Sequence, residues 1–261
     1  MNANIYTLVP RRELGWRMGL ANMLGKENFA WWRTRRWWVQ CLLWLFFLNG
    51  LMAANLANDQ APENAILNYL SVAGAALPIA AIIMGMDSVL GERHSGTAAW
   101  VLSKPLRRPA FILAKLIAYA LGFLSTAIVF PGVVAYIHLA AVGLQLPIAG
   151  FTGTMGLVYL NLLFYLTLSL MLATLFHGRG PVLGITLILV WFWMIPPSAW
   201  LADFMPWRLL IALGDNGALP SLSYYLLFGL PLPTLAPIIT TVLWCVLFIS
   251  VAIWRIRREE F

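Results

Sequence analysis

The sequence predicts an all-α integral membrane protein with six transmembrane helices. Of its 261 residues, 61% are hydrophobic and only 10% are charged, which excludes an ordinary soluble globular domain. Apolar runs of about 20 residues, the length that spans a bilayer as a helix, recur along the chain. The Lys and Arg residues gather in alternate connections between these runs, as they do in multi-pass membrane proteins.

Residues 1–38 form a basic and aromatic segment ahead of the first apolar run. The segment has no apolar core followed by a small-residue cleavage site, so we expect it to remain in the protein. Its last part suits a helix in the lipid headgroup layer, and it suits a specific contact with a partner equally well. The predicted membrane-interface anchors are Trp31, Trp32, Arg35, Arg36, Trp37 and Trp38.

The first two spans are expected at 39–57 and 69–90. The connection between them contains Asp59 and Glu63 but no Lys or Arg, which places it outside the cell. The second span therefore returns the chain to the cytosol, with Asp87 close to its inner end.

Residues 91–115, here called the polar segment, are the one sizeable polar stretch between two apolar runs. Their pattern predicts a short helix, a break and a new helix with Pro109 in its first turn, all in the cytosolic loop between spans two and three. We expect Asp87 to form an ion pair near the inner face with a basic residue of this segment, such as Lys115 or Arg93. The charged residues of the segment are Glu92, Arg93, Lys104, Arg107, Arg108 and Lys115.

The remaining spans follow the same hydropathy pattern. Between the fifth and sixth, residues 200–233 are aromatic and rich in Pro and Gly, and they are too apolar for a free loop. We expect one or two short helices there that re-enter the membrane or lie on its outer face. The last four spans are expected at 116–142, 153–176, 182–200 and 234–254.

The distribution of positive charge predicts the topology. All but one of the 17 Lys and Arg residues, the exception being Arg208, fall in segments that this order of spans places on the inner face. Such an asymmetry predicts a multi-pass protein of the cell (plasma or inner) membrane with both termini cytosolic. It also accounts for the net charge of +7 without a nucleic-acid partner.

The sequence offers little support for catalytic or metal chemistry. It has no phosphate-binding loop of the G-x-x-x-x-G-K-[ST] type, no H-E-x-x-H and no C-x-x-C, and its three His residues are scattered over different segments. We therefore assign no catalytic residues and no metal site. An intramembrane enzyme that uses His138 with Asp87 remains an alternative, and so does a membrane scaffold or sensor subunit.

The polar segment carries a family pattern: an E-R-x-x-G-T run just after the second span, then L-S-x-P, then basic residues leading into the third span. In this pattern and in the order of its spans, the chain resembles the permease subunits of ABC transporters of the type-2 exporter class. The resemblance covers nearly the whole chain. The matching residues are Glu92, Arg93, Gly96, Thr97, Leu102, Ser103, Pro105, Arg108 and Lys115.

The resemblance implies a single transmembrane permease domain over 1–261, in which residues 91–115 hold a coupling helix. A separate cytosolic ATPase subunit would dock on this helix and would bind the ATP and Mg, with no cofactor in this chain. A second permease chain, identical or different, would complete the assembly. No residue identifies the substrate, although strongly apolar spans favour an amphipathic or lipid-like cargo over an ion.

Overall fold

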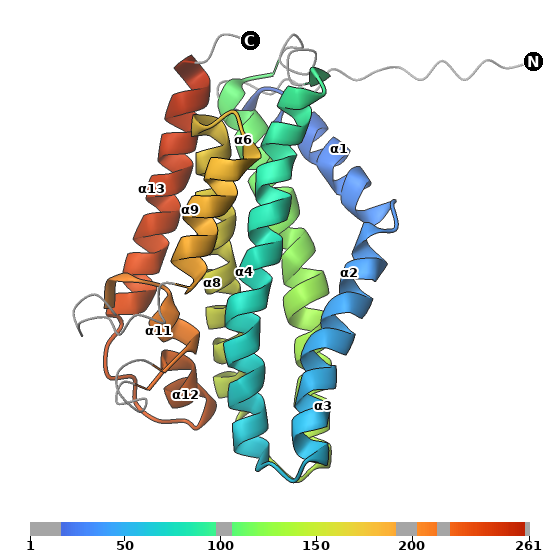
Figure 1. Cartoon of the computed structure of the whole chain (residues 1–261), viewed down its shortest axis with the longest axis vertical. Coiled ribbons are helices and arrows are strands. Elements are labelled where there is room, and N and C mark those ends of the chain that lie inside the picture. Colours follow the sequence, from blue (N-terminus) through green and yellow to red (C-terminus); the bar gives the residue numbers. More distant parts are fainter. Residues whose placement is uncertain (1–16, 98–105, 192–202, 213–219, 259–261) are drawn as a thin grey trace, which may run out of the picture.

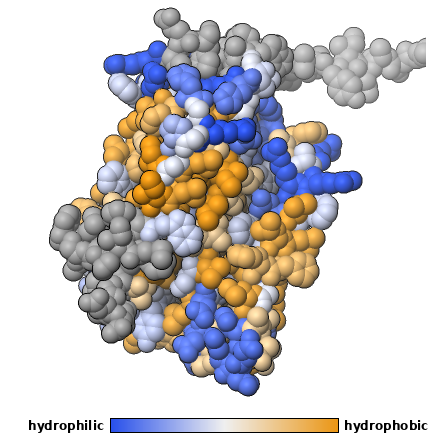
Figure 2. Space-filling view, in the orientation of Figure 1, coloured by the Kyte–Doolittle hydropathy of each residue, from blue (hydrophilic) through white to orange (hydrophobic). Residues whose placement is uncertain are grey.

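The computed structural model describes residues 17–97, 106–191, 203–212 and 220–258. In these parts of the chain all regular structure is helical, and five helices are long and apolar enough to cross a membrane. The long helices run side by side as an elongated bundle (Figure 1). On the face shown in Figure 2, hydrophobic residues cover most of the middle of the bundle and hydrophilic residues lie at both ends.

The first half of the bundle contains three of the long helical stretches. A short helix, α1, precedes them and leans against the bundle (Figure 1). Helix α1 is Leu20–Trp32. The first span consists of α2 (Arg36–Trp44), η2 (Leu45–Asn49) and α3 (Gly50–Ala57), and the second span is α4 (Pro62–His94). The third span consists of α6 (Arg108–Phe123), η3 (Leu124–Val129) and α7 (Phe130–Ala141).

Among the described residues, the second half contains two long helices and three shorter ones. Its elements are α8 (Ile148–Leu175), α9 (Arg179–Trp191), α11 (Trp207–Leu210), α12 (Leu222–Leu227) and α13 (Ala236–Arg258).

The first and third spans each contain a π-helical turn, and the two spans pack together at these turns. Pro131 explains the turn in the third span, because proline has no N–H to donate to the carbonyl four residues earlier. The Nδ2 of Asn49, in η2, donates to the carbonyl oxygen of Pro131 at 3.2 Å. This buried hydrogen bond joins η2 to the first turn of α7, which directly follows η3.

Helix α8 is the centre of the bundle. It packs most extensively against α4 and α13, and 67% of its most apolar stretch is buried, against 22% in the first span and in α13. The Nδ2 of Asn161 on α8 donates to the carbonyl oxygen of Gly74 on α4 at 3.2 Å. Gly85 of α4 lies so close to Ser169 that a Cβ there would overlap the serine hydroxyl. The second and fourth spans therefore form the rigid core, and the first and last spans lie at its edge.

The helix ends at the polar segment confirm one part of the prediction and correct another. A new helix begins at Arg108 with Pro109 in its first turn, as predicted, so Lys115 lies within α6. Helix α4 continues to His94, beyond the predicted end of the second span at residue 90, so Glu92 and Arg93 lie within this helix. The physical reason is that each of these charged side chains has a polar partner on a neighbouring helix, as described below. Hydropathy alone ends a span at the first charge and cannot see such partners.

The structure supports five of the six predicted spans. The fifth prediction, 182–200, corresponds to α9, but the stretch around Pro196 and Pro197 lies outside the described residues. In the predicted region of short helices, α11 and α12 pack against α8. Arg208 of α11 is buried and forms an ion pair with Asp203.

Candidate functional site

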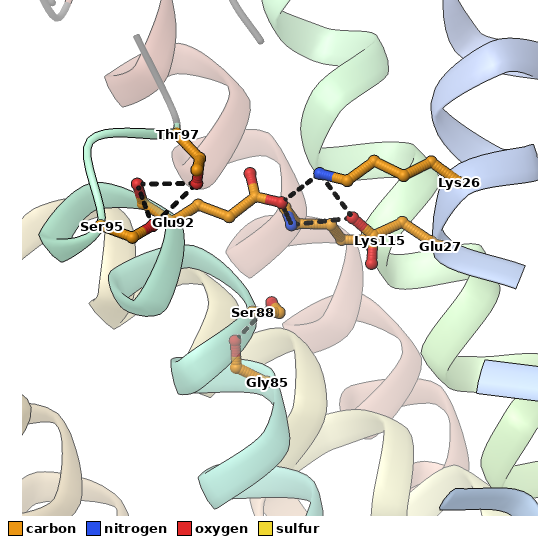
Figure 3. A network of polar contacts seen from close by, with 8 residues as sticks. All are labelled: Lys26, Glu27, Gly85, Ser88, Glu92, Ser95, Thr97 and Lys115. Atoms are coloured by element: carbon orange, nitrogen blue, oxygen red, sulfur yellow. Dashed lines mark hydrogen bonds and ion pairs between the residues drawn. The ribbon is translucent and has the colours of Figure 1, made fainter. Parts of the chain in front are cut away.

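Four charged side chains from three helices meet at the end of the bundle where the polar segment lies. Lys26 and Glu27 come from α1, Glu92 from the last turns of α4, and Lys115 from α6 (Figure 3). The Lys115 Nζ lies 3.0 Å from Glu27 Oε1 and 3.0 Å from Glu92 Oε1. Lys26 Nζ lies 2.6 Å from the same Glu92 oxygen and 4.0 Å from Glu27 Oε1. We call these four residues the charge cluster.

The charge cluster is neutral as a whole and mostly buried. The exposed fraction of the side chain is 1% for Lys115, 8% for Glu27 and 16% for Glu92, whereas Lys26 is 48% exposed. A buried charge is tolerated when an opposite charge and hydrogen bonds replace the lost water. Since both carboxylates depend on Lys115, this lysine holds α1, α4 and α6 in one arrangement.

Helix α1 is also held to α6 by Trp31, which was predicted to be a membrane anchor. That prediction is wrong, because Trp31 is 1% exposed and packs edge-on against the rings of Tyr119 and Phe123. Gly122 lies beneath its indole, where a Cβ would overlap the ring. The other predicted tryptophan anchors, Trp32, Trp37 and Trp38, are each about 40% exposed.

Arg93 joins the end of α4 to the end of α8. Its guanidinium donates to the carbonyl oxygens of Ala173 at 2.7 Å, Thr174 at 3.3 Å and Phe176 at 3.3 Å. The last carbonyls of a helix have no partner within the helix and carry a partial negative charge, so a guanidinium there both donates hydrogen bonds and stabilises the dipole. Beside it, His94 Nε2 lies 3.1 Å from the carbonyl oxygen of His177.

Arg108 makes the equivalent connection to the last helix. Its Nη1 donates to the carbonyl oxygens of Arg257 at 2.8 Å and Ile256 at 3.3 Å, at the end of α13. The neighbouring Arg107 N–H donates to the carbonyl oxygen of Met18, just before α1, at 3.0 Å. Both flanks of the polar segment are thereby fixed to other helices.

The predicted ion pair between Asp87 and Lys115 is corrected by the structure. Asp87 Oδ1 lies 2.6 Å from Arg179 Nη2 at the start of α9, and Lys115 pairs with Glu27 and Glu92. Arg93, the other partner considered for Asp87, is directed to the carbonyls at the end of α8. The reason is that the two acidic residues project from different sides of α4. Asp87 lies on the side that faces α9, whereas Glu92 lies on the side that faces α6.

The sequence matches the family model described as ABC-2 family transporter protein over residues 26–261. The chain belongs to the ABC-2 transporter family. The match begins at Lys26 and so includes the whole charge cluster and the whole polar segment. A comparison with curated proteins found no match.

Membership confirms the family resemblance and makes the chain a multi-pass membrane protein with a role in membrane transport. Members of this ABC-2 permease family are typically the non-catalytic membrane subunit, and the family implies partnership with an ATPase subunit. Among the described residues, no three His, Cys, Asp or Glu side chains gather where they could hold a metal ion.

The structure of this ABC-2 transporter shows how α4 ends within the polar segment. Gly96 adopts a positive φ of 69°, a conformation that favours glycine, and its N–H donates to the carbonyl oxygen of Arg93 at 3.1 Å. The hydroxyls of Ser95 and Thr97 lie 2.8 Å apart, and each donates to the carbonyl oxygen of Glu92 at 3.3 Å. The predicted coupling residues Leu102, Ser103 and Pro105 lie outside the described residues.

Two partners in this site were missed by sequence reasoning. Glu27 and Arg179 carry the charges opposite Lys115 and Asp87, but neither lies in the family pattern. Glu27 could have been found from its place beside Lys26 in the basic and aromatic N-terminal segment. A carboxylate in such a segment needs an opposite charge if it becomes buried.

The alternative intramembrane enzyme is not supported by the geometry. Asp87 lies near the end of α4 at the polar segment, whereas His138 lies in the last turn of α7, at the opposite end of the bundle. From Asp87 to the start of α4 at Pro62 the helix rise alone amounts to about 37 Å. The two side chains therefore cannot act on one substrate atom in this arrangement.

Proposed function

We propose that this chain is the membrane-spanning translocation subunit of an ATP-driven exporter. A separate ATPase subunit, which binds the ATP and Mg, docks on the polar segment 91–115. ATP-dependent movement of that subunit is passed to the transmembrane helices through the contacts on either side of the docking site. The substrate crosses the membrane between this chain and a second permease chain, identical or different.

The observation that carries the proposal is the fixing of both flanks of the polar segment. On one flank, Glu92 is held by the charge cluster and Arg93 by the carbonyls at the end of α8. On the other flank, Arg108 is held by the end of α13 and Lys115 by α1. A force applied between these flanks therefore reaches α1, α4, α6, α8 and α13 together, as a coupling element requires.

In this proposal Glu92 and Arg93 do not bind the ATPase directly. Their side chains are directed to partners within the chain, so they position the segment and leave its apolar central part to enter a groove on the ATPase. In this proposal the charged residues at both flanks stiffen the segment, and its central part supplies the docking surface.

The proposed orientation places the charge cluster in the cytosol. This end of the bundle carries Lys26, Arg93, Arg108 and Arg257, whereas the connection before α4 carries Asp59 and Glu63. That distribution follows the positive-inside rule and puts the ATPase, a nucleotide-dependent protein, on the side where ATP is available.

The first span supplies a surface for the second permease chain. Its outward face is strongly apolar, with Phe46 71% exposed, Phe47 50% and Leu43 47%. Only 22% of the most apolar stretch of this span is buried within the chain, which leaves it free to face lipid or a partner helix. The proposed interface pairs this span with the fifth span of the second chain, of which the structure describes α9.

The test is purification of the tagged chain from its native membranes in mild detergent, with assay of ATP hydrolysis by the proteins that accompany it. The informative substitution is Gly96→Val, because a β-branched residue opposes a φ of 69° and misdirects the segment that follows. We expect the accompanying ATPase to be lost or to hydrolyse ATP independently of the permease, and Gly96→Asn, which tolerates this conformation, to retain it.

Gly143→Val is the matched control, since Gly143 has a φ of 91° but lies in the connection at the opposite end of the bundle. It should strain the backbone equally and leave the ATPase bound. If all three variants retain a normally coupled ATPase, the polar segment is not the coupling element. If the chain in its native membranes brings no nucleotide-hydrolysing protein with it, a scaffold or sensor subunit becomes the better assignment.

A further inference from the structure

A second site lies on the opposite side of α4 from the charge cluster. A cavity of about 520 Å³ opens between α2, α4, α6 and α9, near the same end of the bundle. Its polar lining comes from Arg36 and Gln40 of α2, Asp87 of α4, Tyr119 of α6 and Arg179 of α9. This mixture differs from a helix packing defect in the membrane, which would be lined by apolar side chains.

The cavity carries an excess of positive charge. Arg179 is balanced by Asp87, and both side chains remain more than half exposed, at 55% and 57%. Within the part of the chain that the structure describes, no ion pair joins Arg36 to a carboxylate; its side chain interacts with the Tyr119 hydroxyl. Two guanidinium groups and one carboxylate thus leave one positive charge for a ligand.

Two helices also begin at this cavity. Arg36 is the first residue of α2 and Arg179 the first residue of α9, and neither helix has an acidic residue in its first turn. The cap residue of α2, Arg35, makes no side-chain hydrogen bond to the helix. The Arg36 N–H donates to Thr34 Oγ1 at 3.3 Å. The N–H groups at a helix start carry partial positive charge, which adds to that of the guanidinium groups.

The walls of the cavity change from polar to apolar within one helical turn. On α9, Leu183 lies four residues after Arg179, and on α4, Ile83 and Met84 lie four and three residues before Asp87. Residues at these spacings share one helix face, so the apolar groups lie deeper in the bundle than the charged ones. A ligand with a charged head and an apolar tail would place its head between the arginines and its tail toward the membrane interior.

We propose that this cavity binds an amphiphile whose phosphate head group carries a net negative charge, with the phosphate held between Arg36 and Arg179. Guanidinium groups bind phosphate oxygens through paired, charge-assisted hydrogen bonds, and a phosphate has more oxygens than a carboxylate with which to bind two guanidinium groups at once. Asp87 limits the attraction by occupying Arg179 in the absence of ligand. The proposal requires only that the chain is a membrane protein, so it stands or falls separately from the coupling role of the polar segment.

Three probes added to the purified complex in neutral detergent test the proposal. Dioctanoyl phosphatidic acid has an anionic phosphate and two short tails. Dioctanoyl phosphatidylcholine has the same tails, but choline balances the charge of its phosphate. Inorganic phosphate represents the head group without tails. We expect calorimetry to show saturable binding of phosphatidic acid, with at least about tenfold weaker binding of the other two. Equal affinity for the phosphatidic acid and phosphatidylcholine analogues, or no saturable binding, would overturn the proposal.

Two substitutions in the cavity, with opposite expected effects, test whether phosphatidic acid binds there. Arg36→Gln should weaken phosphatidic acid binding by about tenfold, because one charge-assisted contact is lost, and Asp87→Asn should strengthen it, because Arg179 is released. Arg33→Gln is the matched control, since Arg33 is exposed and stacks on Phe29 outside the cavity. Binding that is unchanged in Arg36→Gln, or weakened in both cavity variants, would place the ligand elsewhere.

The source of the phosphate is decided in nanodiscs of phosphatidylcholine with and without an excess of phosphatidylglycerol. Displacement of the phosphatidic acid probe by phosphatidylglycerol identifies a site for anionic membrane lipid. Retention of the probe in that excess identifies a site for another phosphate-bearing amphiphile, such as a transported molecule. Both outcomes support the cavity as a phosphate site and assign it to one source.

Discussion

Lys115 is the residue on which the charge cluster depends most. It is almost fully buried, its ammonium contacts both carboxylates, and it also lies over the ring of Phe111 at 4.8 Å. The family pattern singled out Lys115 and Glu92, but it could not supply Glu27, because that partner is brought in by the docking of a separate helix. Sequence reasoning therefore found the charges of the polar segment and missed what neutralises them.

Substitution of Lys115→Met should strongly destabilise the fold. It leaves Glu27 and Glu92 close together with only the half-exposed Lys26 to balance them, and removal of one partner from a buried ion pair costs about 3–5 kcal/mol. We expect a lower midpoint of thermal unfolding in detergent. The double variant Lys115→Met with Glu27→Met, which retains the 2.6 Å pair of Lys26 and Glu92, should recover part of the loss. Equal destabilisation of the single and double variants would show that charge is not the cause.

Gly122 tests the docking of α1 through packing alone. A Cβ at Gly122 would overlap the indole of Trp31, so Gly122→Ala should push α1 away from α6 and speed hydrogen exchange over residues 20–32. Gly25→Ala is the control within α1, because nothing lies within 4 Å of its Cβ, and alanine there should stabilise the helix by up to about 1 kcal/mol. Unchanged exchange in Gly122→Ala would contradict the close packing of Trp31.

At the scale of elements, the helix ends around the polar segment are held by arginines from other helices. Arg93 donates to the end of α8 and Arg108 to the end of α13. Hydropathy located the long spans well, since a run of apolar residues is a property of the sequence alone. It did not locate the true ends of α4 and α6, because those ends depend on contacts between residues far apart in the chain.

The two arginines make a reciprocal prediction. Arg93→Gln should speed hydrogen exchange in the last turn of α8 and leave the end of α13 unchanged, since Arg93 donates to three carbonyl oxygens at the end of α8. Arg108→Gln should do the opposite. Each variant is the control for the other, and a uniform increase at both helix ends would indicate general destabilisation in place of local capping.

At the scale of the whole molecule, the bundle has a rigid centre and a looser edge. Helices α4 and α8 form the centre, while the first span and α13 are largely unburied within the chain. Five of the six predicted spans correspond to long apolar helices in the structure. The other one, the fifth in chain order, corresponds to α9, which has 13 residues. Pro196 and Pro197 of the predicted span lie outside the described residues, so the end of that span stays a prediction.

The proposed orientation is tested by labelling with a membrane-impermeant maleimide in intact cells. After replacement of Cys41 and Cys245 by Ala, a cysteine at Asn58 should react from outside, and a cysteine at Thr97 should react only after the membrane is opened. Both positions are exposed at their ends of the bundle. The reverse pattern would place the polar segment outside and remove the basis for an ATPase partner there.

The central claim is that the polar segment passes movement of the ATPase to the helices through the charge cluster. The most direct measurement is hydrogen exchange of the purified complex with and without ATP, in the unaltered chain and in the double variant Lys26→Gln with Glu27→Gln. The variant removes both charges of α1 but keeps the neutral pair of Glu92 and Lys115, which lie 3.0 Å apart. We predict that ATP changes exchange in the polar segment of both proteins and in α1 of the unaltered chain only. An equal ATP-dependent change in α1 of both proteins would contradict transmission through the charge cluster.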